Sequence, residues 1–223
     1  MPAFFGRREH DRVVIEGGDA RHLARSLRAR PGESIDVVDP KGFLLRVRVE
    51  SVSADRVEGQ VVDERAHRPE PSAGVTIAIA NLPAPSLELV LSRCTEAGAF
   101  AFVIFDADRS VGRGQKLERW SAICREAAML AARLRVPEVS IASDVDAVIG
   151  SADAAVMLSR AAPRRLADVT EPRDVTLLIG PEGGWTEREL ALATEEASLG
   201  PRNLRAETAA LVGLAIALSA RGD

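Results

Sequence analysis

The chain has 223 residues, of which 46% are hydrophobic and 28% charged, and its formal net charge is −4. This length suits one large domain or two small ones, and the composition is that of a globular protein. No apolar run reaches the roughly 18 residues of a membrane-spanning helix, and the first residues lack the pattern of a secretory signal peptide.

The cysteines and histidines carry no metal signature. Cys94 and Cys124 have no ligand spacing and are interpreted as small buried groups, and the three histidines are scattered along the chain. We therefore expect a cytoplasmic protein with reduced thiols and no metal site.

The charge is unevenly distributed. Residues 1–68 carry 13 Lys and Arg against 12 Asp and Glu, whereas residues 69–223 carry 16 against 21. This balance argues against a protein that coats nucleic acid generally, but it leaves room for a local basic surface.

Residues 1–68 predict a small β-rich domain. Short segments rich in Val and Ile are typical of strands, and Pro40-Lys41-Gly42 is a hairpin turn signal between two of them. The expected strands are 12–16, 34–38, 43–50 and 56–63.

One helix is expected between these strands, with Asp19 as its N-cap and its end near residue 31. Arg21, Arg25 and Arg28 are spaced i, i+4 and i+7, which places them on one helical face. Such a face is either a solvated surface or a contact for phosphate oxygens, to which arginine offers forked donors.

A short polar segment separates this domain from the rest. Residues 66–74 are rich in Pro, Ser and Gly, so we place a linker at 69–74 and a second domain at 75–223. In that domain strands and helices alternate, which predicts a mostly parallel sheet covered on both faces. The expected strands are 75–80, 100–105, 139–142, 154–158 and 175–179, and the expected helices are 86–97, 116–134, 145–150, 186–197 and 208–220.

Two segments point to a ligand site at the carboxyl ends of the strands. Residues 179–184 form a glycine-rich turn after a buried strand, and Thr186 with Glu189 forms a capping box at the next helix. Residues 199–205 form a second loop that leads into the apolar C-terminal helix. The turn lacks the Lys-Ser/Thr of a Walker loop and the spacing of a dinucleotide site, so on its own it is either a tight connection or a small-molecule site.

Together these segments, Ile-Gly-Pro-Glu-Gly-Gly and Leu-Gly-x-x-x-Leu-Arg-x-Glu-Thr-Ala, resemble the RsmE family. The resemblance implies a SPOUT-type, trefoil-knotted sheet with helices on both faces, preceded by a PUA-like β-barrel that binds RNA. It also implies a homodimer that methylates N3 of a uridine in 16S ribosomal RNA with S-adenosylmethionine. Arg21-His22-Leu23 and Leu27-Arg28 in the first domain, and Arg109-Ser110-Val111 in the second, are similar to further family motifs.

The resemblance also implies roles for individual residues. Uracil N3 carries a proton at neutral pH, and we hypothesise that Arg205 stabilises the negative charge that develops on the uracil oxygens. Arg109 and Arg133 would hold RNA together with Arg21, Arg25 and Arg28. The residues expected to bind the cofactor are Leu158, Leu178, Ile179, Gly180, Pro181, Glu182, Gly183, Gly184, Leu199, Gly200, Leu204 and Thr208.

Several alternatives remain open at this stage. Arg205 could cap a neighbouring element, Arg109 could pair with Asp106 or Asp108, and Glu207 fits helix N-terminal electrostatics better than a general base. The family usually has Gln where Leu130 stands. The rival functions are a SPOUT methyltransferase for another RNA position, a non-catalytic RNA-binding relative and, more distantly, a nucleotide hydrolase.

Overall fold

The computed structural model describes residues 2–112, 114–169 and 174–220. The chain divides into two compact units. The first comprises Met1–Glu70 with Ala128–Val136, and the second comprises Pro71–Ala127 with Pro137–Asp223. The chain thus passes from the first unit to the second after Glu70, and residues 128–136, which were expected in the second domain, belong to the first unit.

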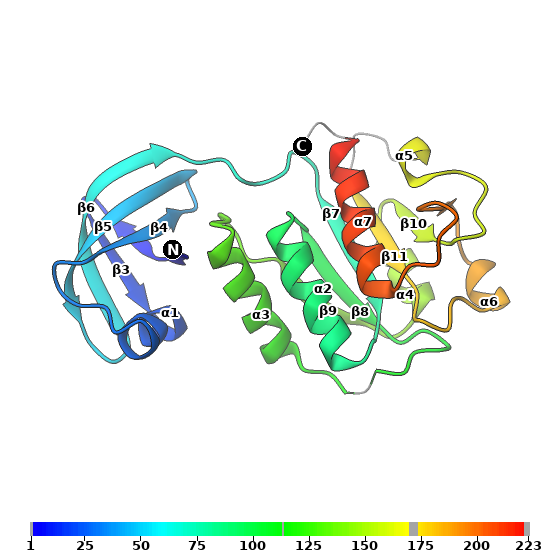
Figure 1. The fold of residues 1–223 in the computed structure, drawn as a ribbon, viewed down its shortest axis with the longest axis horizontal. Coiled ribbons are helices and arrows are strands. Elements are labelled where there is room, and N and C mark those ends of the chain that lie inside the picture. The colour runs from blue at the N-terminus through cyan, green and yellow to red at the C-terminus, as the bar shows by residue number, and fades with distance from the viewer. Residues whose placement is uncertain (1, 113, 170–173, 221–223) are drawn as a thin grey trace. The chain divides into compact units, whose positions relative to one another are not determined.

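The first unit is built on a curled six-stranded sheet with the order β1-β4-β5-β6-β3-β2 (Figure 1). All neighbouring strands pair antiparallel except β1 and β4, which are parallel. The strands are β1 (Ala3–Phe5), β2 (Arg7–Glu9), β3 (Arg12–Glu16), β4 (Ser34–Asp39), β5 (Phe43–Val52) and β6 (Arg56–Ala66).

Alternation of apolar and polar residues explains the sheet. In β5, Leu45, Val47 and Val49 are buried while the residues between them are exposed, as expected for a strand with one face on a core. At the expected hairpin, Gly42 has φ +93° and its N–H donates to the Asp39 carbonyl at 2.9 Å. Four of the strands were predicted from sequence, whereas the short β1 and β2 were missed.

The helix of the first unit differs from the sequence prediction. It consists of α1 (Gly17–Arg21) and a π-helical turn, η1 (His22–Ser26), and Arg28 follows in the left-handed region at φ 52°. Asp19 is not its N-cap: its side chain is buried and accepts a hydrogen bond from the Phe5 N–H at 3.3 Å. Because the helix widens and then ends, Arg21, Arg25 and Arg28 do not share one regular α-helical face, although all three are exposed.

The second unit contains a fully parallel six-stranded sheet with the order β12-β10-β11-β7-β8-β9. The bounds of β7 and β11 match the sequence prediction, since both are short apolar runs between turn residues. The strands are β7 (Val75–Ala80), β8 (Ala101–Phe105), β9 (Glu138–Ala142), β10 (Ala155–Leu158), β11 (Val175–Ile179) and β12 (Glu196–Ala197).

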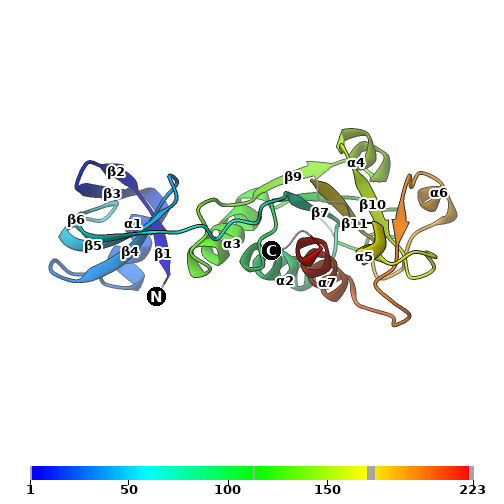
Figure 2. The same ribbon diagram turned by 90° about the horizontal axis from the view of Figure 1, so that it is seen from above.

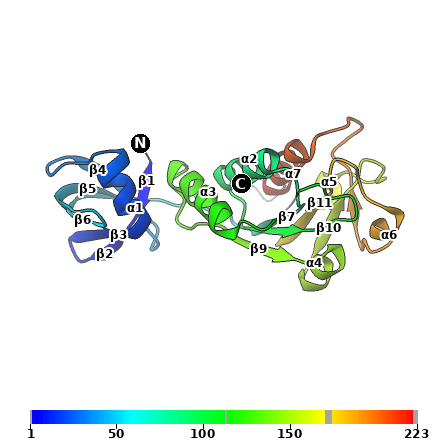
Figure 3. The same ribbon diagram turned by 90° about the horizontal axis from the view of Figure 1, so that it is seen from below.

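Helices cover both faces of this sheet, with α2 and α7 on one face and α4 on the other (Figures 2 and 3). α2 ends before Gly98, which has φ +105°, and the following Ala99 N–H donates to the Cys94 carbonyl, a C-terminal cap of the kind that favours glycine. The helices are α2 (Ala84–Glu96), α3 (Leu117–Leu130), α4 (Val145–Ser151), α5 (Leu166–Val169), α6 (Glu187–Leu190) and α7 (Ala206–Ser219). No helix among the described residues is long and apolar enough to cross a membrane.

Two expected helices are shorter than predicted. α3 ends at Leu130, and Ala132 has φ 51°, so Arg133 lies beyond the helix. The helix expected over 186–197 is wrong after its first turn: α6 spans Glu187–Leu190, and Glu196–Ala197 forms β12 beside β10. Leu190, Leu192 and Ala193 pack against the core of the α4 face, and this tertiary packing outweighs the local helical pattern.

Candidate functional site

A pocket of about 380 Å³ lies in the second unit, at the carboxyl ends of β10 and β11. This volume falls in the range of about 300–1,000 Å³ that small-molecule sites occupy. Three segments meet there: the residues after β10, the glycine-rich turn after β11, and the loop before α7. Its lining is Leu158, Ser159, Arg160, Ala161, Ile179, Gly180, Pro181, Glu182, Gly183, Gly184, Trp185, Leu190, Leu199, Gly200, Arg202, Asn203, Leu204, Ala206 and Ala209.

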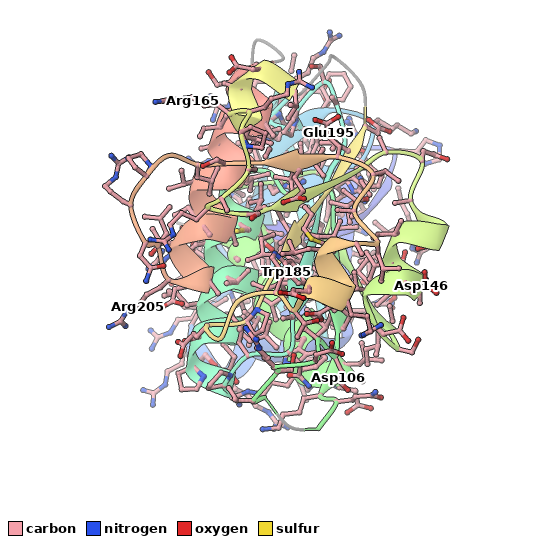
Figure 4. The ribbon with its side chains drawn as sticks, turned by 90° about the vertical axis from the view of Figure 1, so that its right-hand side faces the viewer. Asp106, Asp146, Arg165, Trp185, Glu195 and Arg205 are labelled. Atoms are coloured by element: carbon pink, nitrogen blue, oxygen red, sulfur yellow. The ribbon has the colours of Figure 1, made fainter. Side chains whose placement is uncertain are left out.

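Trp185 connects two of these segments. Its Nε1–H donates to the Leu158 carbonyl at 2.9 Å, and its ring stacks on Phe105 with a centroid distance of 6.2 Å and an interplanar angle of 3°. In Figure 4 it lies centrally among the elements of the second unit. The indole thus fixes the end of β10 relative to the turn after β11, and it is a pocket residue that the sequence analysis did not name.

The glycines of the turn are required by close approach and by backbone conformation. A Cβ atom on Gly180 would lie 2.9 Å from the Trp185 ring. Gly184 has φ +69°, which side-chain-bearing residues rarely adopt, and its N–H donates to the Pro181 carbonyl at 2.9 Å. Larger residues at these positions would therefore change the shape of the pocket.

A buried carboxylate holds the turn to the loop that follows β8. Glu189 has no exposed surface and accepts hydrogen bonds from the N–H groups of Thr186, at 2.8 Å, and Asp108, at 2.9 Å. The bond from Thr186 belongs to the predicted capping box of α6. The bond from Asp108 is an additional contact, made by the loop after β8. Asp108 also accepts from Arg188 at 2.5 Å and from the Thr186 hydroxyl at 2.7 Å, and these bonds lower the pKa of Asp108.

Arg109 acts on the same turn. Its guanidinium donates to the carbonyl of Gly183 at 2.8 Å and more weakly to that of Trp185 at 3.4 Å. The cationic partner of Asp108 is therefore Arg188 rather than Arg109. Arg109 braces the pocket wall, a role that its sequence neighbourhood did not indicate.

Arg205 lies at the edge of this site without lining the pocket. It is the N-cap residue of α7, its side chain is 81% exposed, and it makes no side-chain cap bond. Figure 4 shows it extending outward from the molecule. Its guanidinium lies 3.9 Å from the Glu207 carboxylate, and the other oxygen of Glu207 is buried and has no hydrogen-bond partner among the described residues.

Most, but not all, of the residues expected to bind the cofactor line the pocket. Leu178 is fully buried in the sheet and Thr208 is exposed on α7, so neither lines the pocket. Conversely, Arg160 and Arg202 line it but were not expected to. The other ten residues expected to bind the cofactor all line it: Leu158, Ile179, Gly180, Pro181, Glu182, Gly183, Gly184, Leu199, Gly200 and Leu204.

Arg133, expected to hold RNA, belongs to the first unit and is committed to a structural contact there. Its side chain is 3% exposed and forms an ion pair with Glu70 at 2.5 Å. Glu70 also accepts a hydrogen bond from the Leu134 N–H at 2.8 Å. The pair thus holds residues 128–136 in the first unit, and this burial leaves little of the guanidinium to a ligand.

No group of three or more His, Cys, Asp and Glu side chains in the described ranges 2–112, 114–169 and 174–220 is placed to hold a metal ion.

Comparison with known families matches this arrangement of a curled sheet followed by an α/β unit with a ligand pocket. Residues 15–62 match the RNA methyltransferase PUA domain, and residues 68–218 match the RNA methyltransferase domain. The fold and site thus define the class of two-domain RNA methyltransferases with a SPOUT-like sheet.

Individual relatives narrow the family. The chain is 32% identical over 221 residues to ribosomal RNA small subunit methyltransferase E of Mycobacterium bovis, covering 91% of this chain and 84% of that protein. It is 32% identical over 222 residues to the same enzyme of Bacillus subtilis, covering 90% and 87%. The chain belongs to the ribosomal RNA small subunit methyltransferase E family, the RsmE family that its motifs indicated.

A solved structure agrees with this placement. Ribosomal RNA small subunit methyltransferase E of Neisseria gonorrhoeae, crystallised with S-adenosyl methionine, superimposes with a TM-score of 0.86 at 27% identity. The match covers 96% of this chain and 95% of that one.

Proposed function

We propose that this protein transfers a methyl group from S-adenosylmethionine to N3 of a uridine in 16S ribosomal RNA. The observation that carries the proposal is the pocket formed by the turn after β11 and the loop before α7, because it unites the two motifs of the family in one site. The names of the relatives support ribosomal RNA as the substrate, and the cofactor in the Neisseria gonorrhoeae structure supports S-adenosylmethionine.

The residues of the pocket fit this cofactor. Three glycines expose backbone donors and acceptors for the polar adenosine edges, while Ile179, Leu199 and Leu204 offer an apolar surface to the adenine ring. When bound, the cofactor supplies a methyl group on a positively charged sulfur. The protein's part is to bind and orient it so that the methyl group faces the acceptor nitrogen in line.

Arg205 is the proposed catalytic residue. It lies between Leu204 and Ala206, which both line the pocket, and its exposed guanidinium is available to a base that enters from solvent. Loss of the N3 proton leaves negative charge on the uracil oxygens, which a guanidinium stabilises through charge-assisted hydrogen bonds. The target base must be unpaired or flipped out, because N3 lies on its Watson–Crick edge.

Calorimetric titration with S-adenosylmethionine tests the cofactor site. The Gly183→Val/Gly184→Val double variant should lose binding, since a Cβ at Gly183 would lie 3.2 Å from the Arg109 side chain and Gly184 has φ +69°. Gly150→Ala is the matched control, because a Cβ there meets no atom within 4 Å. Absence of binding to the folded wild-type protein would remove the methyltransferase proposal in favour of a non-catalytic RNA-binding relative.

Nucleoside analysis identifies the acceptor atom. Unmodified 16S ribosomal RNA, and separately small subunits that lack the modification, are incubated with labelled cofactor, digested and analysed by mass spectrometry. The proposal requires 3-methyluridine, whereas a different methylated nucleoside would establish another RNA position. Arg205→Ala should abolish turnover while cofactor affinity stays within about twofold of wild type.

We further propose a homodimer in which a second copy covers the outer face of α7. This helix is apolar around its circumference, and Leu211 is 37% exposed on it. Light scattering on the wild type and on Leu211→Glu tests this: the wild type should have twice the chain mass and the variant should dissociate. A monomeric, active wild type contradicts it.

A further inference from the structure

Two loops beside the pocket concentrate positive charge in an otherwise acidic unit. Residues 159–165 contain three arginines and residues 198–205 contain two, and neither loop contains an acidic residue. Residues 69–223 as a whole carry 16 basic against 21 acidic residues, so nearly a third of the positive charge falls in these two short segments.

The two loops are held side by side by backbone contacts. The Ser198 N–H donates to the Arg164 carbonyl at 2.8 Å, and the Leu166 N–H donates to the Ser198 carbonyl at 3.0 Å. The Ser159 N–H donates to the Ala197 carbonyl at 2.9 Å. The arginines of both loops therefore lie on two adjacent backbone segments, and Arg160 and Arg202 among them line the pocket.

Three of these arginines are free of acidic partners. Arg164 is paired with Glu195 at 3.1 Å, and Arg205 has Glu207 at 3.9 Å. By contrast, Arg160, Arg165 and Arg202 are exposed and form no ion pair within the part of the chain that the structure describes.

Three exposed arginines elsewhere in this unit are neutralised by carboxylates. Arg93 pairs with Glu96 at 3.0 Å, Arg119 with Glu88 at 2.5 Å and Arg188 with Asp108 at 2.5 Å. Arg109, which is also exposed, donates to the carbonyls of Gly183 and Trp185 rather than to a carboxylate. Among the described residues of this unit, exposed guanidinium groups without an acidic partner are therefore concentrated in the two loops. Figure 4 shows Arg165 and Arg205 extending outward on the same side of the unit, the side of α7.

We propose that Arg160, Arg165 and Arg202, the arginine rim, bind phosphodiester groups of the RNA strand that brings the target base to the pocket. The inference rests on the proposed function and assigns its RNA contact to this unit as well as to the first one. Arg160 and Arg202 line the pocket itself, so phosphates bound there flank a base that enters it. Arginine suits this task because its forked donors match phosphate oxygens and its charge persists at every physiological pH.

Binding of unmodified, transcribed 16S ribosomal RNA, measured by filter retention at several salt concentrations without cofactor, tests the rim. Omitting the cofactor keeps changes in its affinity out of the result. The Arg160→Ala/Arg165→Ala/Arg202→Ala variant should bind at least tenfold more weakly at low salt. Its slope of log affinity against log salt should fall by about 2, since each single-strand phosphate contact contributes about 0.7.

Four further variants define the result. The Arg160→Lys/Arg165→Lys/Arg202→Lys variant should keep most of the slope of log affinity against log salt, because the positive charge remains. Arg93→Ala/Arg119→Ala removes two paired arginines of the same unit and should leave RNA binding unchanged. Arg21→Ala/Arg25→Ala/Arg28→Ala reports on the first unit separately, and Arg165→Glu alone provides a rim variant outside the pocket lining.

The results distinguish failure of the arginine-rim proposal from failure of the proposed function. If the wild type methylates the RNA but the triple alanine variant, folded by circular dichroism, retains wild-type affinity and slope, the rim proposal is overturned. It is also overturned if that variant loses only cofactor affinity. If the wild type transfers no methyl group to any RNA, the proposed function fails, while the salt dependence of RNA binding still decides whether the rim contacts phosphate.

Discussion

The buried carboxylate of Glu189 accepts a hydrogen bond of 2.9 Å from the backbone N–H of Asp108, 81 residues earlier in the chain. Glu189 belongs to α6, directly after the glycine-rich turn. Asp108 lies in the loop that follows β8, a different strand of the sheet. One side chain thereby fixes the relative position of two loops, and the shape of the pocket depends on it.

Glu189→Gln should loosen the pocket. The amide retains one acceptor oxygen but directs its NH₂ toward N–H donors, and an unsatisfied buried group costs about 1–3 kcal/mol. We expect a lower melting temperature and cofactor binding weakened about tenfold, measured by differential scanning calorimetry and titration. The exposed neighbour Glu187→Gln should change neither. An unaltered cofactor affinity in Glu189→Gln would show that the contact does not organise the pocket.

Gly180→Ala should displace the indole of Trp185, because the added Cβ would lie 2.9 Å from the ring. The shift should red-shift the Trp185 emission and weaken cofactor binding, with a cost of about 1–3 kcal/mol for overpacking. A Trp120→Phe background leaves Trp185 as the single tryptophan of the chain. Gly150→Ala in the same background should leave the spectrum unchanged, and identical spectra for both variants would contradict the packing argument.

Arg133→Ala should destabilise the first unit by about 3–5 kcal/mol, because it leaves the Glu70 carboxylate beside a vacated, largely buried site. Guanidinium denaturation measures the loss, and hydrogen exchange at the Leu134 N–H should accelerate, since Glu70 accepts that hydrogen bond. The control Arg93→Ala removes an exposed pair with Glu96 and should cost less than about 1 kcal/mol. Comparable losses for the two variants would mean that the Arg133 pair is no stronger than a surface contact.

Cys94 should be inert to thiol reagents in the native protein. Burial, reinforced by the neighbouring Cys124, raises the pKa of the Cys94 thiol to about 12, so almost no thiolate exists at pH 8. A colorimetric disulfide reagent should label the folded protein only as fast as it opens, and both thiols rapidly in denaturant. Fast labelling of Cys94 under native conditions would contradict its burial.

The Asp108 contact predicts a pH-dependent stability. Hydrogen bonds from Arg188 and then from Thr186 lower the pKa of Asp108, so its contribution is complete above the ordinary aspartate pKa of about 4. That contribution is lost as the pH falls through the lowered value. The melting temperature of Asp108→Asn should therefore lie below wild type by a constant amount between about pH 5 and 8, and the gap should close below about pH 4. Asp146→Asn, on α4, is the control and should show no such closing gap.

Local pattern determined a large part of this protein. The buried runs of β7 and β11 fixed both strands to the residue, since a parallel sheet covered on both faces demands continuous apolar segments. The capping box of Thr186 and Glu189 was also readable, because both of its hydrogen bonds are local. The two motifs around residues 179–184 and 199–209 indicated the family, which the comparisons confirm.

Only the tertiary structure determined the features that depend on contacts between residues distant in sequence. The chain after Leu190 leaves the helical pattern because Glu196–Ala197 pairs with the edge of β10 and neighbouring apolar residues fill the core. Arg133 is structural because Glu70 lies beside it, and Arg109 braces the pocket because the Gly183 carbonyl is within its reach. The trefoil knot that the resemblance implies stays a prediction. The spacing of apolar residues and the residue preferences of turns act over a few neighbouring residues, so they can be recognised in the sequence. The partner of a charged side chain is often distant in sequence, and only the folded chain brings the two together.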